Sequence, residues 1–268
     1  MAQRNVVVGR RHVRTMTSPD SPYAYGETFL KYTSDASFGS AKIIAPLVYN
    51  WLPVTSVIDF CCAQGAWFAA WRTLGADDIL GVDGAYVDID QLMIPRHAFK
   101  GINLSEPLDL GRKVDLVQSL EVGEHIPAAL ARQFVSNLTA HGEIILFSAA
   151  PPGQGGEHHV NEQPYEYWRQ LFQEHGYEMY DPIRTLIKDN PDIQYWYRFN
   201  IFIFASKEVA ATLPDQILCT HLPVGSAIPD ISPPVFKFRK AIVRCLPTVL
   251  RNRIAQAKAK LTVRRAGP

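Results

Sequence analysis

The sequence has few cysteines and no long apolar run. The four cysteines, two of them adjacent, lack the spacing of a disulfide framework or of a zinc site. No apolar stretch reaches the roughly 18 to 20 residues that a bilayer-spanning helix needs, and the arginine-bearing start has no apolar signal core. These absences argue against a disulfide-stabilised secreted scaffold and against a transmembrane protein. We therefore expect a cytoplasmic protein.

Acidic residues are missing from both ends of the chain. From Val235 to Pro268 there are ten Lys and Arg residues and no Asp or Glu, and the first fifteen residues hold four arginines and no acid. Of the 27 basic and 26 acidic residues, the body between the ends therefore carries 13 basic and all 26 acidic ones. General nucleic-acid binding needs cationic side chains that displace phosphate counterions. We accordingly expect no nucleic-acid partner.

Length and composition fit one folded domain with additions at its ends. A chain of 268 residues with 47% apolar and 20% charged residues buries a full core of ordinary size, and a second complete domain has no room. We expect an N-terminal extension over residues 1–36 and a main domain over 37–205. A Pro-rich irregular segment over 206–234 and a basic tail over 235–268 follow.

The main domain alternates apolar strands with helical stretches. This is the pattern of a mainly parallel sheet covered by helices on both faces. We expect helices over Gly65–Leu74 and Pro127–Leu138, and a third that opens at Pro164 and ends at Gly176. The predicted strands are Ser56–Phe60, Ile79–Val82, Phe99–Leu104, Val114–Leu120, Glu143–Ala149, Tyr177–Tyr180 and Tyr195–Ala205.

Three places in the sequence mark a candidate site. In open α/β sheets, ligands bind beyond the carboxyl ends of the strands, where the strand order reverses. This rule points to the turn Asp59–Gly65, to Asp83 and to the segment Ser119–His125. Residues 151–156 read Pro-Pro-Gly-Gln-Gly-Gly, which cannot form regular structure and is long enough for a mobile lid.

The turn from Asp59 to Gly65 carries a family resemblance. An acid at a strand end, followed by a short turn and a helix, resembles the nucleotide-binding loop of the class I S-adenosylmethionine-dependent methyltransferases. Cys61 and Ala63 stand at two of that family's three glycine positions, and Gly65 keeps the third. A pyrophosphate needs glycine because backbone amides approach it very closely, whereas S-adenosylmethionine has no phosphate. The two missing glycines therefore argue more strongly against a dinucleotide-binding site than against an S-adenosylmethionine-binding site.

The resemblance, which covers roughly residues 37–205, implies a fold and a set of donor contacts. The fold is α/β, with a Rossmann-like, seven-stranded, mainly parallel sheet, helices on both faces and one antiparallel edge strand. Asp83, at the end of the second strand, suits a carboxylate that accepts hydrogen bonds from both ribose hydroxyls. Asn103 stands where the family has an acid that contacts the adenine amino group. The candidate donor-binding residues are Asp59, Cys61, Ala63, Gly65, Asp83, Asn103, Leu104, Ser119 and Leu120.

A second constellation follows the fourth strand. Glu121, Glu124 and His125 are spaced i, i+3 and i+4, so a helical turn would project all three to one side. Two carboxylates and an imidazole are either a proton-transfer group or ligands for a divalent cation. His159, after the expected lid, is a candidate to join them, whereas His158 is as well explained as a solvated loop residue.

The Glu-x-x-Glu-His pattern with a later histidine resembles the metal site of the small-RNA ribose 2′-O-methyltransferases, and a similar pattern stands in the ubiquinone-pathway O-methyltransferases. The resemblance implies Mg²⁺ or Mn²⁺ bound by Glu121, Glu124, His125 and His159. Two other interpretations stay open. His125 or His159, with Glu124, acts as a metal-free catalytic acid–base group, or the acids only stabilise the start of the next helix.

The basic tail alternates apolar and cationic residues. Such a segment can lie on an anionic membrane at its inner face, pack on the acidic body of the same or a partner chain, or remain a solvated helix. A homodimer is compatible with the second arrangement. The sequence does not decide among them.

These observations predict an S-adenosylmethionine-dependent methyltransferase. Its expected acceptor is a hydroxyl of a sugar, a glycan or another small polyhydroxylated molecule, with or without a divalent metal. Two alternatives remain: a metal-independent methyltransferase of a lipid-like or quinone-like acceptor, and a methyltransferase-like adaptor without turnover.

Overall fold

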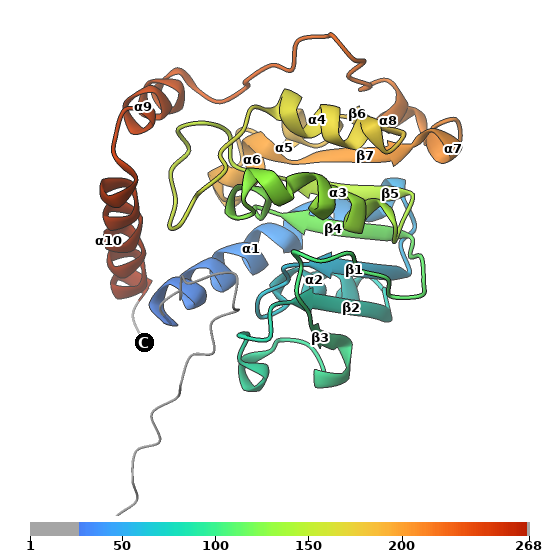
Figure 1. Cartoon of the computed structure of the whole chain (residues 1–268), viewed down its shortest axis with the longest axis horizontal. Coiled ribbons are helices and arrows are strands. Elements are labelled where there is room, and N and C mark those ends of the chain that lie inside the picture. The colour runs from blue at the N-terminus through green and yellow to red at the C-terminus, as the bar shows by residue number, and fades with distance from the viewer. Residues whose placement is uncertain (1–26, 267–268) are drawn as a thin grey trace, which may run out of the picture.

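The computed structural model describes the backbone of residues 27–266 and the side chains of residues 33–262. Residues 1–26 of the expected N-terminal extension and the last two residues of the tail lie outside the described part. The described strands form one sheet in the order β3-β2-β1-β4-β5-β7-β6 (Figure 1). They are β1 Ser56–Phe60, β2 Asp78–Asp83, β3 Phe99–Gly101, β4 Leu116–Leu120, β5 Ile144–Ser148, β6 Tyr177–Tyr180 and β7 Phe202–Ser206.

Strand direction confirms the predicted Rossmann-like sheet. The strands β3, β2, β1, β4 and β5 are paired in parallel, and β7 runs antiparallel to both of its neighbours, β5 and β6. The order reverses between β1 and β4, because the chain moves outward to β2 and β3 and then returns to the far side of β1. The loops that follow β1 and β4 therefore leave toward different faces of the sheet, and in open α/β sheets ligands bind at such a point.

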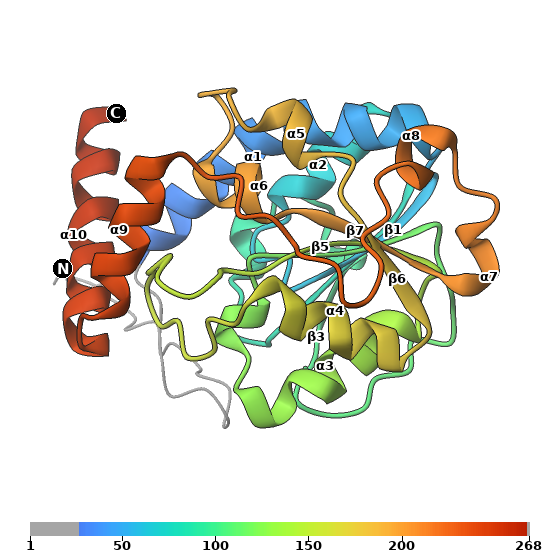
Figure 2. The same ribbon diagram turned by 90° about the horizontal axis from the view of Figure 1, so that it is seen from above.

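Helices cover both faces of the sheet (Figure 2). On one face lie α1 (Glu27–Trp51), α2 (Ala66–Thr73), α5 (Arg184–Ile187) and α6 (Tyr195–Asn200); on the other lie α3 (Ala131–Thr139) and α4 (Tyr165–Glu174). Neighbouring strand residues alternate between two apolar cores: Leu116 joins the α1 and α2 side, and Val117 joins the α3 and α4 side. The two short helices after β7 are α7 (Lys207–Ala210) and α8 (Asp215–Leu218).

The predicted strand over Tyr195–Ala205 was wrong in its first half. Residues Tyr195–Asn200 form helix α6, and only Phe202–Ser206 form a strand. The aromatic run suits either element by composition, and packing decides between them. In the helix, the Tyr197 ring lies edge-on to Trp67 at 5.4 Å, and its hydroxyl is 2.8 Å from the Ser37 hydroxyl.

Other element ends differ by less. The expected helix from Pro127 begins as a 3-10 turn over Ala128–Leu130, and α3 follows it. β3 ends at Gly101 rather than at Leu104, and Val114 makes only an isolated bridge to Gly142 before β4 begins.

Two helices form the basic tail: α9 (Pro234–Arg244) and α10 (Thr248–Ala266). They lie together at one end of the molecule, beside the long loop that follows β5 and next to α1 (Figure 2). Within residues 27–266, no helix combines the length and the apolar character needed to cross a bilayer.

Candidate active site

The loop after β1 adopts the backbone path of a glycine-rich turn with only one glycine. Cys61, Ala63 and Gly65 have φ angles of 59°, 48° and 82°. An L-residue in this left-handed region costs about 1 to 2 kcal/mol, which glycine avoids. Position 65 favours glycine for a second reason, because a Cβ there would lie 3.0 Å from Ile94 Cγ2. The chain therefore holds a strained loop where the sequence predicts donor contacts.

Hydrogen bonds fix this loop on β2. The amide of Cys61 donates to the carbonyl oxygen of Val82 over 2.7 Å, and the amide of Ala63 donates to Asp83 Oδ2 over 2.8 Å. The sharp turn that they hold leads directly into α2, for which Gly65 is the N-cap.

Asp59 and Asp83 lie at the carboxyl ends of β1 and β2, as predicted, and Asp83 is two residues beyond Gly81, the partner of Asp59. Both are buried, and burial is the main cause that raises the pKa of each. The charge of Asp83 raises the pKa of Asp59 further, and a hydrogen bond with Gln118 opposes this. The two buried carboxylates can accept hydrogen bonds from hydroxyl or ammonium groups of a ligand.

Tyr86 forms a hydrogen bond with one acid of this pair. Its hydroxyl donates to Asp83 Oδ1 over 2.7 Å, and the amide of Gly84 donates to the same oxygen over 2.6 Å. The Tyr86 side chain is nevertheless 47% exposed. Sequence reasoning missed Tyr86, because nothing in its spacing distinguishes it from an ordinary loop tyrosine.

The remaining predicted donor residues shape the same edge of the sheet. Asn103 Oδ1 accepts from the amide of Ser105 over 3.1 Å, and Asn103 Nδ2 donates to Glu106 over 3.0 Å, so this side chain closes a turn after β3. Leu104 packs half-buried against the core on the α3 and α4 side. Ser119 and Leu120 are buried at the end of β4.

Glu121 is strained and half-buried beside this edge. Its φ is 57°, and its amide donates to the Ser148 carbonyl oxygen over 2.9 Å. The carboxylate accepts from Gln154 Nε2 over 2.6 Å and from Asn200 Nδ2 over 3.3 Å, while burial raises the pKa of Glu121 to about 7. Sequence reasoning missed both amides, because Gln154 lies in the irregular loop and Asn200 in the segment predicted as a strand.

The structure brings three of the four proposed metal ligands together. Ligand atoms of Glu124, His125 and His159 all lie within 4.8 Å of one another. Glu121 adjoins them through the side chain of Glu124 but is held by the two amides. The expected single helical turn was wrong, because Glu121 is left-handed and only Gly123–His125 form a 3-10 turn.

The surroundings of the two histidines suit a metal. His159 Nδ1 lies 2.9 Å from Glu162 Oε1, and His125 Nδ1 lies 3.2 Å from the His158 carbonyl oxygen. A proton on each Nδ1 places the lone pair on Nε2, the arrangement in which metal-binding histidines are oriented by an acceptor behind them. His159 Nε2 lies 3.9 Å from Glu124 Oε1. Burial lowers the pKa of His125 to about 3, so this ring is neutral.

Glu124 is the clearest sign of an additional ligand. It is 1% exposed, and its Oε2 has no hydrogen-bond partner among the described residues. Burial raises its pKa, and the charge of Glu121 raises it further. An unsatisfied buried carboxylate oxygen is costly unless a cation or a donor binds there. These residues therefore fit a hard or borderline divalent cation.

Hydrogen bonds hold the loop of residues 151–163 in place, both within the loop and to the tail. Amides of Gly153 and Gly155 donate to the Glu162 carboxylate over 2.8 and 2.7 Å. The tail contributes four further hydrogen bonds. Arg239 Nη1 donates to the Gln154 carbonyl oxygen over 2.9 Å, and Asn252 Oδ1 accepts from the His158 amide over 3.1 Å. Arg251 donates to Glu162 over 3.4 Å, and Gln256 donates to Glu157 over 3.1 Å. The sequence analysis did not identify Glu162, although its position three residues after His159 could have indicated a contact between the two side chains.

Comparison with known proteins supports the fold. No protein-family model and no curated protein matches the chain. Among solved structures, the sugar N-methyltransferase KedS8 from a Streptoalloteichus species is similar with 14% identity and a TM-score of 0.51, over 71% of this chain and 99% of that chain. That identity shows the fold alone.

Two other solved structures have lower scores. A putative O-methyltransferase from Nostoc punctiforme has 16% identity and a TM-score of 0.49, over 66% of this chain and 59% of that chain. The S-adenosylmethionine-bound amino pentose methyltransferase CalS10 from Micromonospora echinaspora has 14% identity and a TM-score of 0.48, over 70% and 100%. Both scores are too low to support an inference. The chain therefore shares the Rossmann-like fold of the sugar N-methyltransferase KedS8.

Replacing Ala63 by glycine tests the strain in the β1 loop. Relief of the left-handed strain, about 1 to 2 kcal/mol, outweighs the freedom that glycine gains in the unfolded chain, about 0.4 to 1 kcal/mol. We expect Ala63→Gly to raise the free energy of unfolding in urea by roughly 0.5 to 1 kcal/mol. The control Ala69→Gly, inside α2, is expected to lower it by about 1 kcal/mol. Equal losses in both variants would contradict a strained loop.

Proposed function

We propose that the chain transfers the methyl group of S-adenosylmethionine to a hydroxyl of a sugar, a glycan or another small polyhydroxylated acceptor. The observation that carries this proposal is the left-handed β1 loop beside the buried pair Asp59 and Asp83, with the Glu124, His125 and His159 cluster at the neighbouring strand end. The first group suits an adenosine that bears an amino-acid end, and the second suits an acceptor hydroxyl that must lose its proton.

In this proposal, Asp83 binds the donor's ribose. A ribose hydroxyl is the same kind of donor as the Tyr86 hydroxyl that now bonds Asp83 Oδ1. Tyr86 therefore moves aside when the donor binds, which its exposed position permits. Asp59 supplies a second buried carboxylate, whose ionised form the donor's ammonium group stabilises.

The acceptor chemistry is assigned to the cluster at the end of β4. Glu124, His125 and His159 would hold a Mg²⁺ or Mn²⁺ ion, which would supply a Lewis acid that lowers the pKa of the acceptor hydroxyl. Glu162 and the His158 carbonyl oxygen keep the two imidazoles in the required tautomer. Glu121, fixed by Gln154 and Asn200, adds negative charge beside Glu124.

A metal-independent reaction is the rival for the same residues. His125 is neutral and half-buried, so it can accept a proton only from a group held directly against it. A chelator separates the two mechanisms, since it stops only the metal-assisted reaction.

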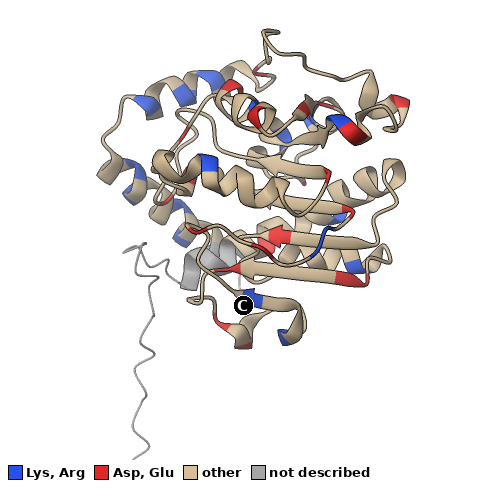
Figure 3. Cartoon of the chain, turned by 45° about the vertical axis from the view of Figure 1, so that its right-hand side comes forward, with Lys and Arg blue, Asp and Glu red and all other residues tan. Residues whose placement is uncertain are grey.

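The tail supports a second proposal, that the protein binds the surface of an anionic membrane. The inner faces of α9 and α10 hold the 151–163 loop, while both helices also expose large apolar side chains and α10 exposes the cations Arg253 and Lys260. Figure 3 shows Lys and Arg but no acid along these helices. The exposed apolar residues are Val235, Phe238, Ile242, Val249, Leu250, Ile254 and Leu261. An apolar face rimmed by cations suits the headgroup region of anionic lipids, where each nearby cation contributes about 1 kcal/mol.

Donor binding is tested by two substitutions, one at the Asp83 carboxylate and one at the tyrosine that donates a hydrogen bond to it. We expect Asp83→Asn to weaken S-adenosylmethionine binding at least tenfold in calorimetry, because hydrogen bonds to a charged group are worth about 1.5 to 3 kcal/mol. Tyr86→Phe removes the competing hydroxyl and is expected to leave affinity equal or higher. The exposed Asp90→Asn, seven residues along, is the matched control. Unchanged affinity in Asp83→Asn would reject the proposed ribose contact.

Metal binding is tested at Glu124. In protein freed of metal with a chelator, added Mn²⁺ is expected to raise the melting temperature by mass action. Glu124→Gln is expected to abolish this rise while leaving S-adenosylmethionine affinity within about twofold, since the donor contacts lie at β1 and β2. Glu178→Gln on β6 serves as the control. Equal loss of both ligands would show instead that Glu124 supports the donor pocket.

Membrane binding is tested with vesicles. We expect the full chain to sediment with phosphatidylglycerol vesicles at low salt and much less with phosphatidylcholine vesicles. Phe238→Ser is expected to weaken the partition about tenfold, because it removes roughly 1.5 kcal/mol or more of apolar burial. Leu186→Ser on α5, which is exposed to a similar extent, is expected to have no effect. Equal partition to both lipids, or equal effects of both substitutions, would refute a specific membrane face.

A further inference from the structure

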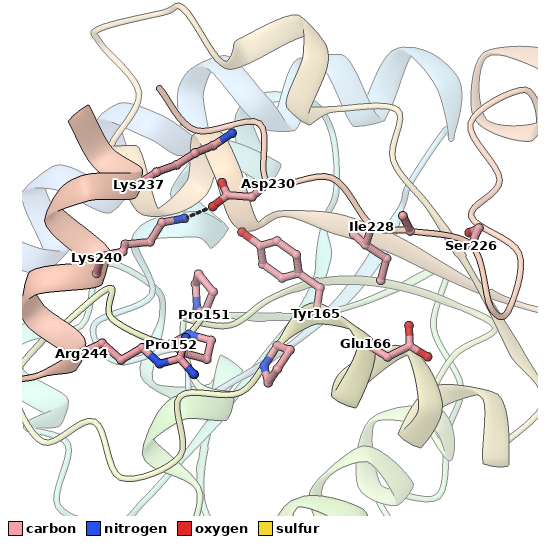
Figure 4. A pocket seen from close by; sticks show the side chains of 13 residues that line it. Pro151, Pro152, Tyr165, Glu166, Ser226, Ile228, Asp230, Lys237, Lys240 and Arg244 are labelled. Carbon is pink, nitrogen blue, oxygen red and sulfur yellow. Dashed lines mark hydrogen bonds and ion pairs between the residues drawn. The ribbon is translucent and has the colours of Figure 1, made fainter. Parts of the chain in front are cut away.

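A cavity of about 600 Å³ lies outside the cluster, between α9, the start of α4 and the segment of residues 226–230 (Figure 4). Pro151, Pro152 and the ring of Tyr165 form an apolar side. Lys237, Lys240 and Arg244 line the opposite side. Their spacing along α9, three and then four residues, places all three on one helix face.

The cations of this cavity outnumber its available acids. Lys240 Nζ pairs with Asp230 Oδ2 at 2.5 Å, and Glu166 is paired with Arg169 outside the cavity. Within residues 33–262, Lys237 and Arg244 have no ion-pair or hydrogen-bond partner, so two positive charges remain uncompensated. A concave site of this volume, with an apolar wall and two unpaired cations, suits an anionic organic ligand.

The cavity is connected to the proposed reaction site through a few shared residues. The Tyr165 hydroxyl donates to Asn200 Oδ1 over 2.9 Å, and Asn200 Nδ2 donates to Glu121 Oε1 over 3.3 Å. A second, small hollow is lined by Gln154 and Asn200 and shares Pro151 and Lys240 with the large cavity. The large cavity therefore adjoins the side chain of Glu121, at the edge of the cluster, through the Tyr165 and Asn200 side chains.

We propose that Lys237, Lys240 and Arg244 form a subsite for the phosphate or diphosphate group of the acceptor, so that the substrate is a phosphorylated sugar. The inference rests on the proposed methyl transfer and narrows its substrate class. The phosphate oxygens bind the two unpaired cations and displace Asp230 in part from Lys240. The sugar then lies along the Tyr165 ring, with its hydroxyls directed toward the cluster.

Calorimetry of the full chain with inorganic pyrophosphate and with glucose 1-phosphate tests this subsite. A chelator removes metal, so that pyrophosphate reports only the protein's own cations, and sodium chloride fixes the ionic strength. We expect both probes to bind and glucose not to bind. The double variant Lys237→Gln, Arg244→Gln is expected to weaken both at least tenfold. The control is Arg253→Gln on α10, an exposed cation outside the cavity, which is expected to change nothing.

The outcomes separate this inference from the proposed function. Absent binding of both probes, or equal losses in the double variant and the control, overturns the phosphate subsite even if S-adenosylmethionine binds. Absent S-adenosylmethionine binding overturns the methyl transfer, while the anion measurement still stands on its own.

A further arm uses phosphatidylcholine vesicles that carry a polyprenyl diphosphate sugar. Recruitment that the double variant loses supports the subsite with a lipid-linked source. Binding of glucose 1-phosphate without recruitment supports it with a soluble source.

Discussion

The candidate site depends on the hydrogen bonds that tie the β1 loop to β2. The Ala63 amide donates to the Asp83 carboxylate, and the Cys61 amide donates to the carbonyl oxygen of Val82, the residue before Asp83 in β2. These bonds hold Cys61 and Ala63 in a left-handed conformation that is otherwise unfavourable for residues with a Cβ. They also orient Asp83 beside Asp59 and fix where α2 begins. The loop thus keeps the backbone path of a glycine-rich turn although two of the three glycines are missing. This favours the proposed donor-binding loop over the alternative of a methyltransferase-like adaptor without turnover.

Sequence pattern predicted most of the sheet because its strands are short, apolar and closed by acids or turns. Asp59 and Asp83 were placed correctly, since parallel neighbours bring their carboxyl ends to one edge of the sheet. The pattern did not separate helix from strand over Tyr195–Ala205, where aromatic residues suit both and contacts with distant Trp67 and Ser37 decide.

The site's supporting residues were harder to predict than its central ones. Glu124, His125 and His159 carry recognisable chemistry, whereas Gln154 and Asn200 are ordinary amides until the fold places them against Glu121. The same holds for the tail. Its charge was evident from composition, but the fold shows that its inner faces fasten the loop bearing His159 while Lys237 and Arg244 line a cavity. The tail therefore connects the loop that bears His159 with the exposed surface of the molecule.

The most direct test of the central claim is the melting temperature of the full chain with and without S-adenosylhomocysteine, the demethylated donor. At a ligand concentration about one hundred times Kd, mass action adds roughly 2.7 kcal/mol of stability. For a domain of this size, that amount corresponds to a rise of roughly 5 to 10 °C. A rise of that order that saturates with ligand is the predicted result. An unchanged melting temperature at millimolar ligand would contradict a donor site at the ends of β1 and β2.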